Sequence, residues 1–158
     1  MYYIAVVGGS QCSVEEESIA FEVGRSIAQK GGTVICGGGP GVMEAAARGA
    51  DSAGGVAIGI LPGPDHREGN RYLKYSIATG LGEARNAIIT RTADAVIAVG
   101  GEYGTLSEIA LAMKMGKPVI TVKSWSISPP GKLKTAQISV NNADDAVSIA
   151  INKIKQNE

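Results

Sequence analysis

The sequence predicts a single α/β domain over residues 1–158, built on a doubly wound, mostly parallel sheet with helices on both faces. Three observations predict this fold class. Short apolar runs alternate with helix-like segments along nearly the whole chain. These runs are continuously apolar, which is typical of strands buried on both faces of a sheet. Right-handed crossovers between parallel strands then place helices on both faces.

The apolar runs and the breaks between them give the expected elements in chain order. The expected strands are residues 2–7, 33–36, 55–61, 72–77, 95–99, 119–122 and, at an edge, 136–140. The expected helices run from about 13 to 30, 41 to 53, 82 to 92 and 105 to 115, with a last helix capped by Asn141 or Asn142. Residues 62–71 and 124–134 are expected to be loops. Together these elements form one Rossmann-like unit without a linker.

Capping signals justify the helix limits. Ser13 and Glu16 have the spacing of a capping box, and apolar residues then recur every four positions. The Gly31-Gly32 pair ends that helix. Pro118 ends the expected helix at 105–115. Acidic residues begin the last helix and lysines end it, as the helix dipole favours.

Composition excludes several classes of protein. The chain has 15 basic and 15 acidic side chains, so its zero net charge disfavours non-specific nucleic-acid binding. Hydrophobic residues make up 44% of the sequence, which excludes a disordered chain. No apolar run approaches the ~20 residues of a membrane helix, and the N-terminus predicts a strand rather than a signal peptide. Two isolated cysteines predict a cytoplasmic protein without disulfides or a metal site.

Three glycine-rich turns, at residues 8–10, 37–41 and 100–105, each follow an expected strand. Parallel strands end at the same edge of a sheet, and ligands bind there near the switch in strand order. Glycine lets the main chain approach a ligand closely, and a helix N-terminus offers unpaired N–H donors. The turns therefore predict a site for a phosphorylated ligand at this edge.

Familiar phosphate and hydrolase motifs are missing from these turns. The first turn lacks G-x-G-x-x-G, and Cys36 and Gly37 stand where a dinucleotide site has an acidic residue. The chain also lacks a P-loop motif and the G-x-S-x-G elbow of serine hydrolases. NAD binding, ATP hydrolysis by a P-loop and serine-hydrolase chemistry are therefore not supported.

Three ordered segments resemble the signatures of the LOG-like superfamily. They are Gly37–Met43 (GGGPGVM), Glu83–Asn86 (EARN) and Gly100–Glu108 (GGEYGTLSE). The resemblance covers about residues 2–122. The superfamily includes cytokinin-nucleotide phosphoribohydrolases, proteins once described as lysine decarboxylases, and molybdenum-cofactor carrier proteins. The ARN sequence and the small size are most similar to the carrier branch. No lysine here suggests the decarboxylase chemistry.

The resemblance implies a catalytic pair, if the protein is an enzyme, of Arg85 and Glu108. It implies, with the glycine turns, that the ligand and its phosphate contact Gly8, Gly9, Ser10, Gly38, Gly39, Gly41, Met43, Arg85, Asn86, Gly100, Gly101, Gly104, Thr105 and Glu108. The hydrolase branch typically carries R-K and then P-G-G-x-G-T-x-x-E. Here Asn86 replaces the Lys, Gly100 the Pro and Glu102 the second Gly.

Each of these residues also has a structural interpretation. Arg85 could form a surface ion pair, Glu108 could stabilise a helix dipole, and Thr105 could cap a helix. Cys12 and Cys36 are expected to be small packing residues rather than nucleophiles, and the only histidine, His66, lies in a polar loop. The aromatic residues could stack on a base or pterin but are expected to pack in the core or an interface: Tyr75, Tyr103 and Trp125.

The leading interpretation is a protein that binds a phosphorylated nucleotide- or pterin-like molecule, as molybdenum-cofactor carriers do. The alternative is a phosphoribohydrolase that releases base and ribose 5-phosphate from a nucleoside 5′-monophosphate. A third interpretation is DNA handling like that of DNA-processing protein A. No cofactor is required; the molybdenum cofactor or a nucleoside monophosphate would be the ligand. Apolar positions in helices 41–53 and 106–115 exceed one buried face, so a homodimer or a tetramer of dimers is expected.

Overall fold

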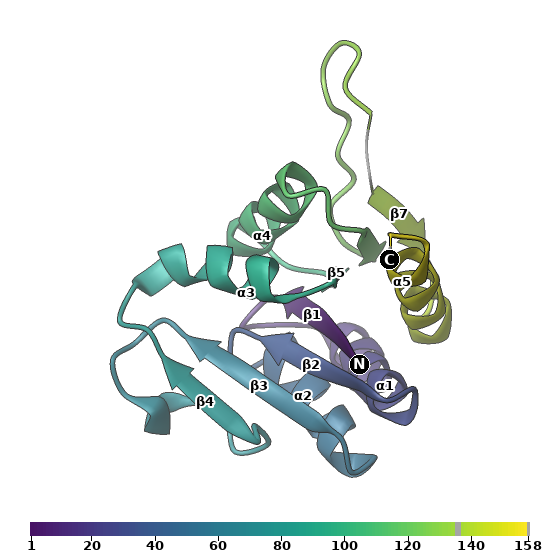
Figure 1. Ribbon diagram of the computed structural model, residues 1–158. Helices are drawn as coiled ribbons and strands as arrows, with labels where there is room; N and C mark the ends of the chain where they lie inside the picture. Colours follow the sequence, from purple (N-terminus) through teal and green to yellow (C-terminus); the bar gives the residue numbers. More distant parts are fainter. Residues whose placement is uncertain (135–136, 158) are drawn as a thin grey trace.

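The computed structural model describes residues 1–134 and 137–157, and it has the predicted α/β fold (Figure 1). Seven parallel strands form one sheet in the order β4-β3-β2-β1-β5-β6-β7 within these residues. The strands are β1 (Tyr2–Gly8), β2 (Gly32–Cys36), β3 (Val56–Leu61), β4 (Tyr75–Ala78), β5 (Ala95–Val99), β6 (Val119–Val122) and β7 (Gln137–Val140). Residue 136, expected to begin the last strand, lies outside the described part of the chain.

Helices cover both faces of the sheet, as expected. They are α1 (Val14–Gln29), α2 (Val42–Ser52), α3 (Asn86–Thr92), α4 (Tyr103–Lys114) and α5 (Ala143–Asn157). A capping box between Ser13 and Glu16 begins α1, as the sequence predicted. The expected helix at 82–92 is divided instead: residues Gly82–Arg85 form a 3₁₀ turn that opens into α3.

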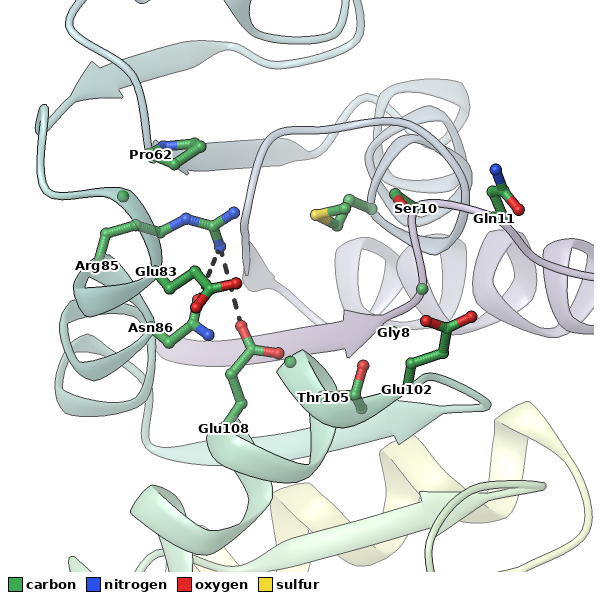
Figure 2. Close-up of a pocket in the computed structure, with 14 residues that line it drawn as sticks. Gly8, Ser10, Gln11, Pro62, Glu83, Arg85, Asn86, Glu102, Thr105 and Glu108 are labelled. Atoms are coloured by element: carbon green, nitrogen blue, oxygen red, sulfur yellow. Dashed lines mark hydrogen bonds and ion pairs between the residues drawn. The ribbon is translucent and has the colours of Figure 1, made fainter.

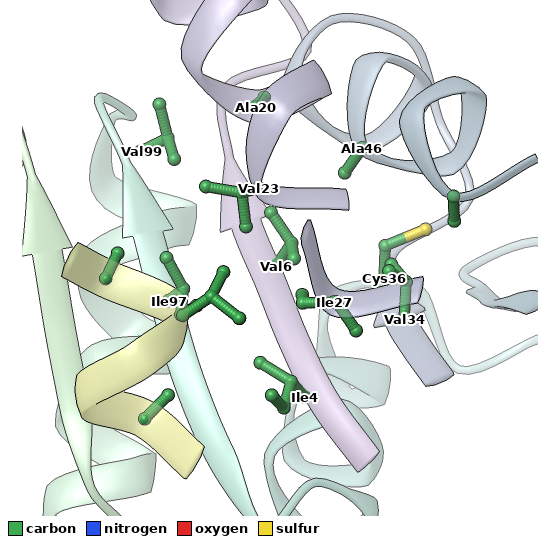
Figure 3. Packing of buried hydrophobic residues seen from close by; sticks show 14 of the residues in the cluster. Ile4, Val6, Ala20, Val23, Ile27, Val34, Cys36, Ala46, Ile97 and Val99 are labelled. Atoms are coloured by element: carbon green, nitrogen blue, oxygen red, sulfur yellow. The ribbon is translucent and has the colours of Figure 1, made fainter. Parts of the chain in front are cut away.

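Alternate residues of each strand face opposite layers. Ile4 and Val6 of β1 pack with α1, α2 and α5, as Figure 3 shows for this layer. Ala5 and Val7 pack with Ile89 of α3 and with α4 on the other face. Because both faces of β1, β2, β5 and β6 are covered, these strands are mostly apolar and almost fully buried, apart from the first residues of β1.

The alanine-rich composition of α2 serves packing within the monomer. Helices α1 and α2 approach so closely that a Cβ on Gly24 would lie 1.9 Å from the Ala46 carbonyl oxygen. A Cβ on Gly49 would lie 2.0 Å from the Phe21 carbonyl oxygen. The alanines of the α2 core face are buried against α1 and the sheet, so they do not form an apolar surface for another subunit.

The strand order reverses at β1, and this point positions the candidate site. From β1 the chain builds β2, β3 and β4 outward on one side, and then crosses to β5, β6 and β7 on the other. Ligands of such sheets bind beyond the carboxyl ends of the strands at this switch. The turn after β1 and the turn after β5 meet here, with α3 and α4 alongside.

Candidate functional site

A pocket of about 530 Å³ lies at the carboxyl ends of β1, β2 and β5, between the β1 turn, α3 and α4 (Figure 2). Its volume falls within the range of small-molecule sites. Its lining residues are Gly8, Gly9, Ser10, Gln11, Met43, Pro62, Gly82, Glu83, Arg85, Asn86, Glu102, Gly104, Thr105 and Glu108. Nine of these were expected from the sequence, so the fold brings most of the candidate residues together.

The second glycine turn supports the first and does not line the pocket. The Gly9 carbonyl accepts a hydrogen bond from the Val42 N–H at 3.0 Å, so the β1 turn occupies one donor at the start of α2. Gly41 has a φ of 69°, and a Cβ there would lie 2.3 Å from the Gly9 oxygen. Gly38 packs against Leu61, and the Gly39 carbonyl accepts from Asn70. Gly38, Gly39 and Gly41 are therefore not among the residues that line the pocket.

The third glycine turn divides into two parts. Gly100 and Gly101 adopt positive φ and line a separate, more open cavity of about 310 Å³ beside Lys123 and Trp125. Gly101 must lack a side chain, because a Cβ would lie 2.2 Å from Thr105 Oγ1. From Glu102 onward, the turn faces the first pocket.

The N-terminus of α4 opens into the pocket. The first hydrogen bond of this helix runs from Leu106 N–H to the Glu102 carbonyl, so the N–H groups before it have no partner within the helix. Glu102 occupies the N-cap position in an extended conformation, and its side chain does not cap the helix. Thr105 is only 3% exposed, and its hydroxyl makes no hydrogen bond among the described residues. Partial positive charge and unused donors therefore meet at this end.

Arg85 and Glu108 form the other end of the pocket. Arg85 Nη1 lies 3.9 Å from Glu108 Oε1, and both side chains are largely buried. Burial raises the pKa of Glu108 to about 7, although the positive charge of Arg85 opposes this shift. Burial likewise lowers the pKa of Arg85, and Glu108 opposes that shift. In Figure 2 Glu83, Arg85 and Glu108 point into the same region of the pocket.

Gly37 creates the space that Arg85 occupies. A Cβ on Gly37 would lie 2.4 Å from Arg85 Nη1 and 2.7 Å from the Met43 sulfur. The guanidinium therefore lies directly on the backbone that follows β2. The sequence placed Gly37 in a turn but gave no signal for this contact, because Arg85 lies far along the chain.

The pocket also contains residues that were not expected as ligand contacts. Glu83 and Glu102 lie within the EARN and GGEYGTLSE motifs, so the motifs could have predicted that they line the pocket. Gln11 follows the first glycine turn directly, whereas no sequence motif indicated that Pro62 and Gly82 would line the pocket. Both new carboxylates are exposed, and neither forms an ion pair within the described part of the chain.

The remaining reactive side chains lie away from the pocket lining. Both cysteines are free thiols, and burial raises the pKa of Cys36 to about 11, which makes it a poor nucleophile. His66 lies on a short 3₁₀ helix after β3, outside the pocket lining. Trp125 donates from its indole nitrogen to the Glu102 carbonyl and packs against Tyr103 with ring centroids 5.7 Å apart. Tyr75 is exposed on the edge strand β4.

No group of three or more potential metal ligands occurs among residues 1–134 and 137–157. None of the helices described here is long and apolar enough to cross a bilayer.

Comparisons with known sequences place this geometry in a family. A model described as the SLOG cluster4 family matches residues 1–156. An uncharacterised protein of Archaeoglobus fulgidus is 49% identical over 76% of this chain and 79% of its own length. The cytokinin riboside 5′-monophosphate phosphoribohydrolase of Mycobacterium tuberculosis is 34% identical over 68% of this chain, which spans 62% of that enzyme.

Solved structures extend the comparison. The molybdenum cofactor binding protein of Rippkaea orientalis has a TM-score of 0.76 and 41% identity, over 79% of this chain and 77% of that one. The molybdenum cofactor carrier protein of Chlamydomonas reinhardtii has a TM-score of 0.83 and 30% identity, over 99% of both chains.

DNA processing protein A of Streptococcus pneumoniae is similar at a TM-score of 0.71 but only 19% identity, over 93% of this chain and 61% of that one. This likeness shows a shared fold alone. The family match and the more similar structures carry the assignment: the chain belongs to the SLOG cluster4 family, within the LOG-like superfamily and close to its molybdenum-cofactor carrier branch.

Proposed function

We propose that this LOG-family protein binds a phosphorylated pterin-like molecule of the molybdenum-cofactor type in the pocket between α3 and α4, and carries it without chemical change. The two ends of the pocket differ in chemistry, and a ligand with a phosphate at one end and a polar heterocycle at the other matches both. The proposal draws support from the two solved neighbours that are described as binding or carrying the molybdenum cofactor.

The observation that carries the proposal is the uncapped start of α4. The N–H groups of Tyr103, Gly104 and Thr105 lack partners within the helix, and the hydroxyl of the pocket-lining Thr105 makes no hydrogen bond among the described residues. Helix N-termini with such donors bind phosphate through hydrogen bonds and the helix dipole. Across the pocket, Gly9 and Ser10 approach the same space from the β1 turn. Phosphate would occupy this space.

The opposite end suits the heterocycle. A buried carboxylate such as Glu108 accepts hydrogen bonds from the amino and ring N–H groups that a pterin and a guanine share. Arg85 donates from the same wall, to carbonyl or phosphate oxygens. This end therefore orients a ligand that carries both donors and acceptors.

Glu102 favours binding over turnover. It places a carboxylate beside the N–H donors of α4, where the hydrolase motif has glycine. A hydrolase that expels ribose 5-phosphate benefits from donors alone around the phosphate. A carrier must also release its ligand, and a nearby carboxylate weakens the hold on an anion.

A phosphoribohydrolase is the second candidate, and one observation favours it. A buried Glu108 with a pKa of about 7 is poised near neutral pH, as a general acid or base should be. The mycobacterial relative is described as such an enzyme.

Glu108→Gln separates the two candidates, because it keeps the shape of the side chain and removes its acid–base function. We expect the wild-type protein to release no base from a panel of nucleoside 5′-monophosphates above the buffer rate. We also expect native mass spectrometry to find a pterin retained by protein purified from cells, and less of it in the variant. Base release by the wild type that falls 10²–10⁴-fold in the variant would establish the hydrolase instead.

A second pair of variants tests where the phosphate binds. A Cβ on Gly104 would meet nothing within 4 Å, so this position tolerates a side chain. Gly104→Asp adds a negative charge at the start of α4, and Gly104→Asn adds a side chain of equal size without charge. We expect Asp to weaken inorganic phosphate binding about tenfold more than Asn, measured from amide shifts in NMR spectra. Equal affinities in both variants would contradict the proposed phosphate position.

A further inference from the structure

A directed chain of hydrogen bonds runs from Arg85 to the first turn of α4. Arg85 Nη1 donates to Asn86 Oδ1 at 3.1 Å, and Asn86 Nδ2 donates to Ser107 Oγ at 3.1 Å. Ser107 Oγ then donates to the Gly104 carbonyl at 2.6 Å. Each hydroxyl or amide in the chain both accepts and donates, so the bonds strengthen one another.

The chain fixes where the Arg85 guanidinium lies. Nη1 is hydrogen-bonded to Asn86, and Gly37 leaves space for the group on the other side. Nη1 remains 3.9 Å from Glu108 Oε1, which is beyond hydrogen-bonding distance. No hydrogen bond to the Glu108 carboxylate occurs within the described residues, although this side chain is only 8% exposed. Arg85 and Glu108 thus form an ion pair at 3.9 Å without a direct hydrogen bond.

We propose that Asn86 is a positioning residue that holds Arg85 off Glu108 and so leaves the Glu108 carboxylate available to the ligand. The proposal rests on the proposed function only in its last step, the use of Glu108 by a ligand. Without Asn86, the guanidinium would move to the nearest carboxylate and form a direct, charge-assisted pair with it. The pair would then use the hydrogen-bonding groups that a ligand needs.

An amide meets both demands at this position. Asn86 is 9% exposed and must accept from Arg85 while it donates to Ser107. An aspartate of the same size can accept but cannot donate, and a leucine of similar size can do neither. The hydrolase motif has lysine here, which donates but cannot accept from an arginine.

Four titratable side chains surround Glu108 among the described residues. Arg85 faces it from the start of α3, and its charge lowers the pKa of Glu108. Cys36 faces the pair from β2, and burial keeps its thiol protonated near neutral pH, with its pKa at about 11. Glu83 and Glu102 line the same pocket from the 3₁₀ turn and from the N-cap of α4. Asn86 variants leave all these groups in place.

The experiment measures the acid dissociation constant of Glu108 in the ligand-free, full-length protein from carbon NMR shifts of its carboxyl group. In Asn86→Leu, Arg85 is released toward Glu108, and we expect the constant to rise at least about tenfold. In Asn86→Asp, the new carboxylate competes for Arg85, and we expect the constant to fall. The two variants should therefore move it in opposite directions.

Ser107→Ala is the matched control, because it breaks the chain beyond Asn86 and keeps the bond to Arg85. We expect it to change the Glu108 constant less than Asn86→Leu does. If the variants lose stability while the constant stays at its wild-type value, Asn86 has only a structural role and the proposal is wrong. Failure of the wild-type protein to bind any phosphorylated ligand would contradict the proposed function instead, and this measurement would not detect it.

Discussion

Burial of Glu108 makes the stability of the fold depend on pH. Its folded-state pKa of about 7 lies above the ordinary value of 4.5, so the folded protein holds this proton more tightly than the unfolded chain does. By linkage, Glu108 favours the folded state fully below pH 4.5, and this contribution decreases as the pH rises through about 7.

We predict that Glu108→Gln stabilises the protein relative to wild type at pH 8 more than at pH 4.5. A shift of this size corresponds to about 3 kcal/mol as an upper value. Urea unfolding at the two pH values measures the difference. Glu83→Gln, at an exposed carboxylate of the same pocket, should change stability by less than ~0.5 kcal/mol. A Glu108→Gln effect of equal size at both pH values would contradict the expected burial cost.

Gly37 is the second residue on which the site depends. Gly37→Ala would place a methyl group 2.4 Å from Arg85 Nη1, so the guanidinium must move. We predict a loss of about 1–3 kcal/mol in stability and a clear fall in ligand retention. Gly39→Ala in the same turn meets only the flexible methyl end of Met43, at 3.0 Å, and should keep the site intact. Native mass spectrometry of both variants tests this, and equal ligand retention would count against it.

At the scale of elements, the close packing of α1 on α2 depends on two glycines. A Cβ on Gly24 or Gly49 would lie about 2 Å from a backbone oxygen of the facing helix, and backbone cannot rotate away as a side chain can. We predict that Gly24→Ala and Gly49→Ala each destabilise the fold by about 1–3 kcal/mol or more. Gly104→Ala, in open space at the start of α4, should be neutral or slightly stabilising. Thermal unfolding of the three variants makes the comparison.

At the scale of the whole molecule, the expected homodimer or tetramer of dimers stays a prediction. Helix α2 no longer supports this assembly, because its alanines are buried within the monomer. Helix α4 still does: Leu106 and Leu111 are only half-buried and belong to neither core cluster of the described residues, whereas Met113 packs against the core. We predict a homodimer or a tetramer of dimers that uses these leucines of α4. Light scattering should give a multiple of the 16.2 kDa chain, and Leu111→Lys should reduce it. Val14→Lys, at an isolated exposed position on α1, is the control; a monomeric wild type would refute the prediction.

The sequence by itself determined the fold class, the order of the elements and the edge of the sheet that carries the site. Hydrophobic runs, capping residues and glycine turns are local patterns, and a parallel sheet collects the ends of its strands on one side. The predicted strand at 72–77 and the predicted single helix at 82–92 had wrong limits, since β4 covers Tyr75–Ala78 and a 3₁₀ turn precedes α3. Exposed and glycine-bounded segments have weak patterns, which is why the sequence misplaced these limits.

Only the tertiary structure decided which turns face the pocket. The β1 turn covers the start of α2 through the bond between Gly9 and Val42, whereas the start of α4 remains open. Arg85 lies on Gly37, and Asn86 is joined to Ser107, although these partners are distant in the sequence. Such contacts depend on how strands and helices meet in space, which no local pattern records. The same packing buries Glu108 and gives this carboxyl group its raised pKa.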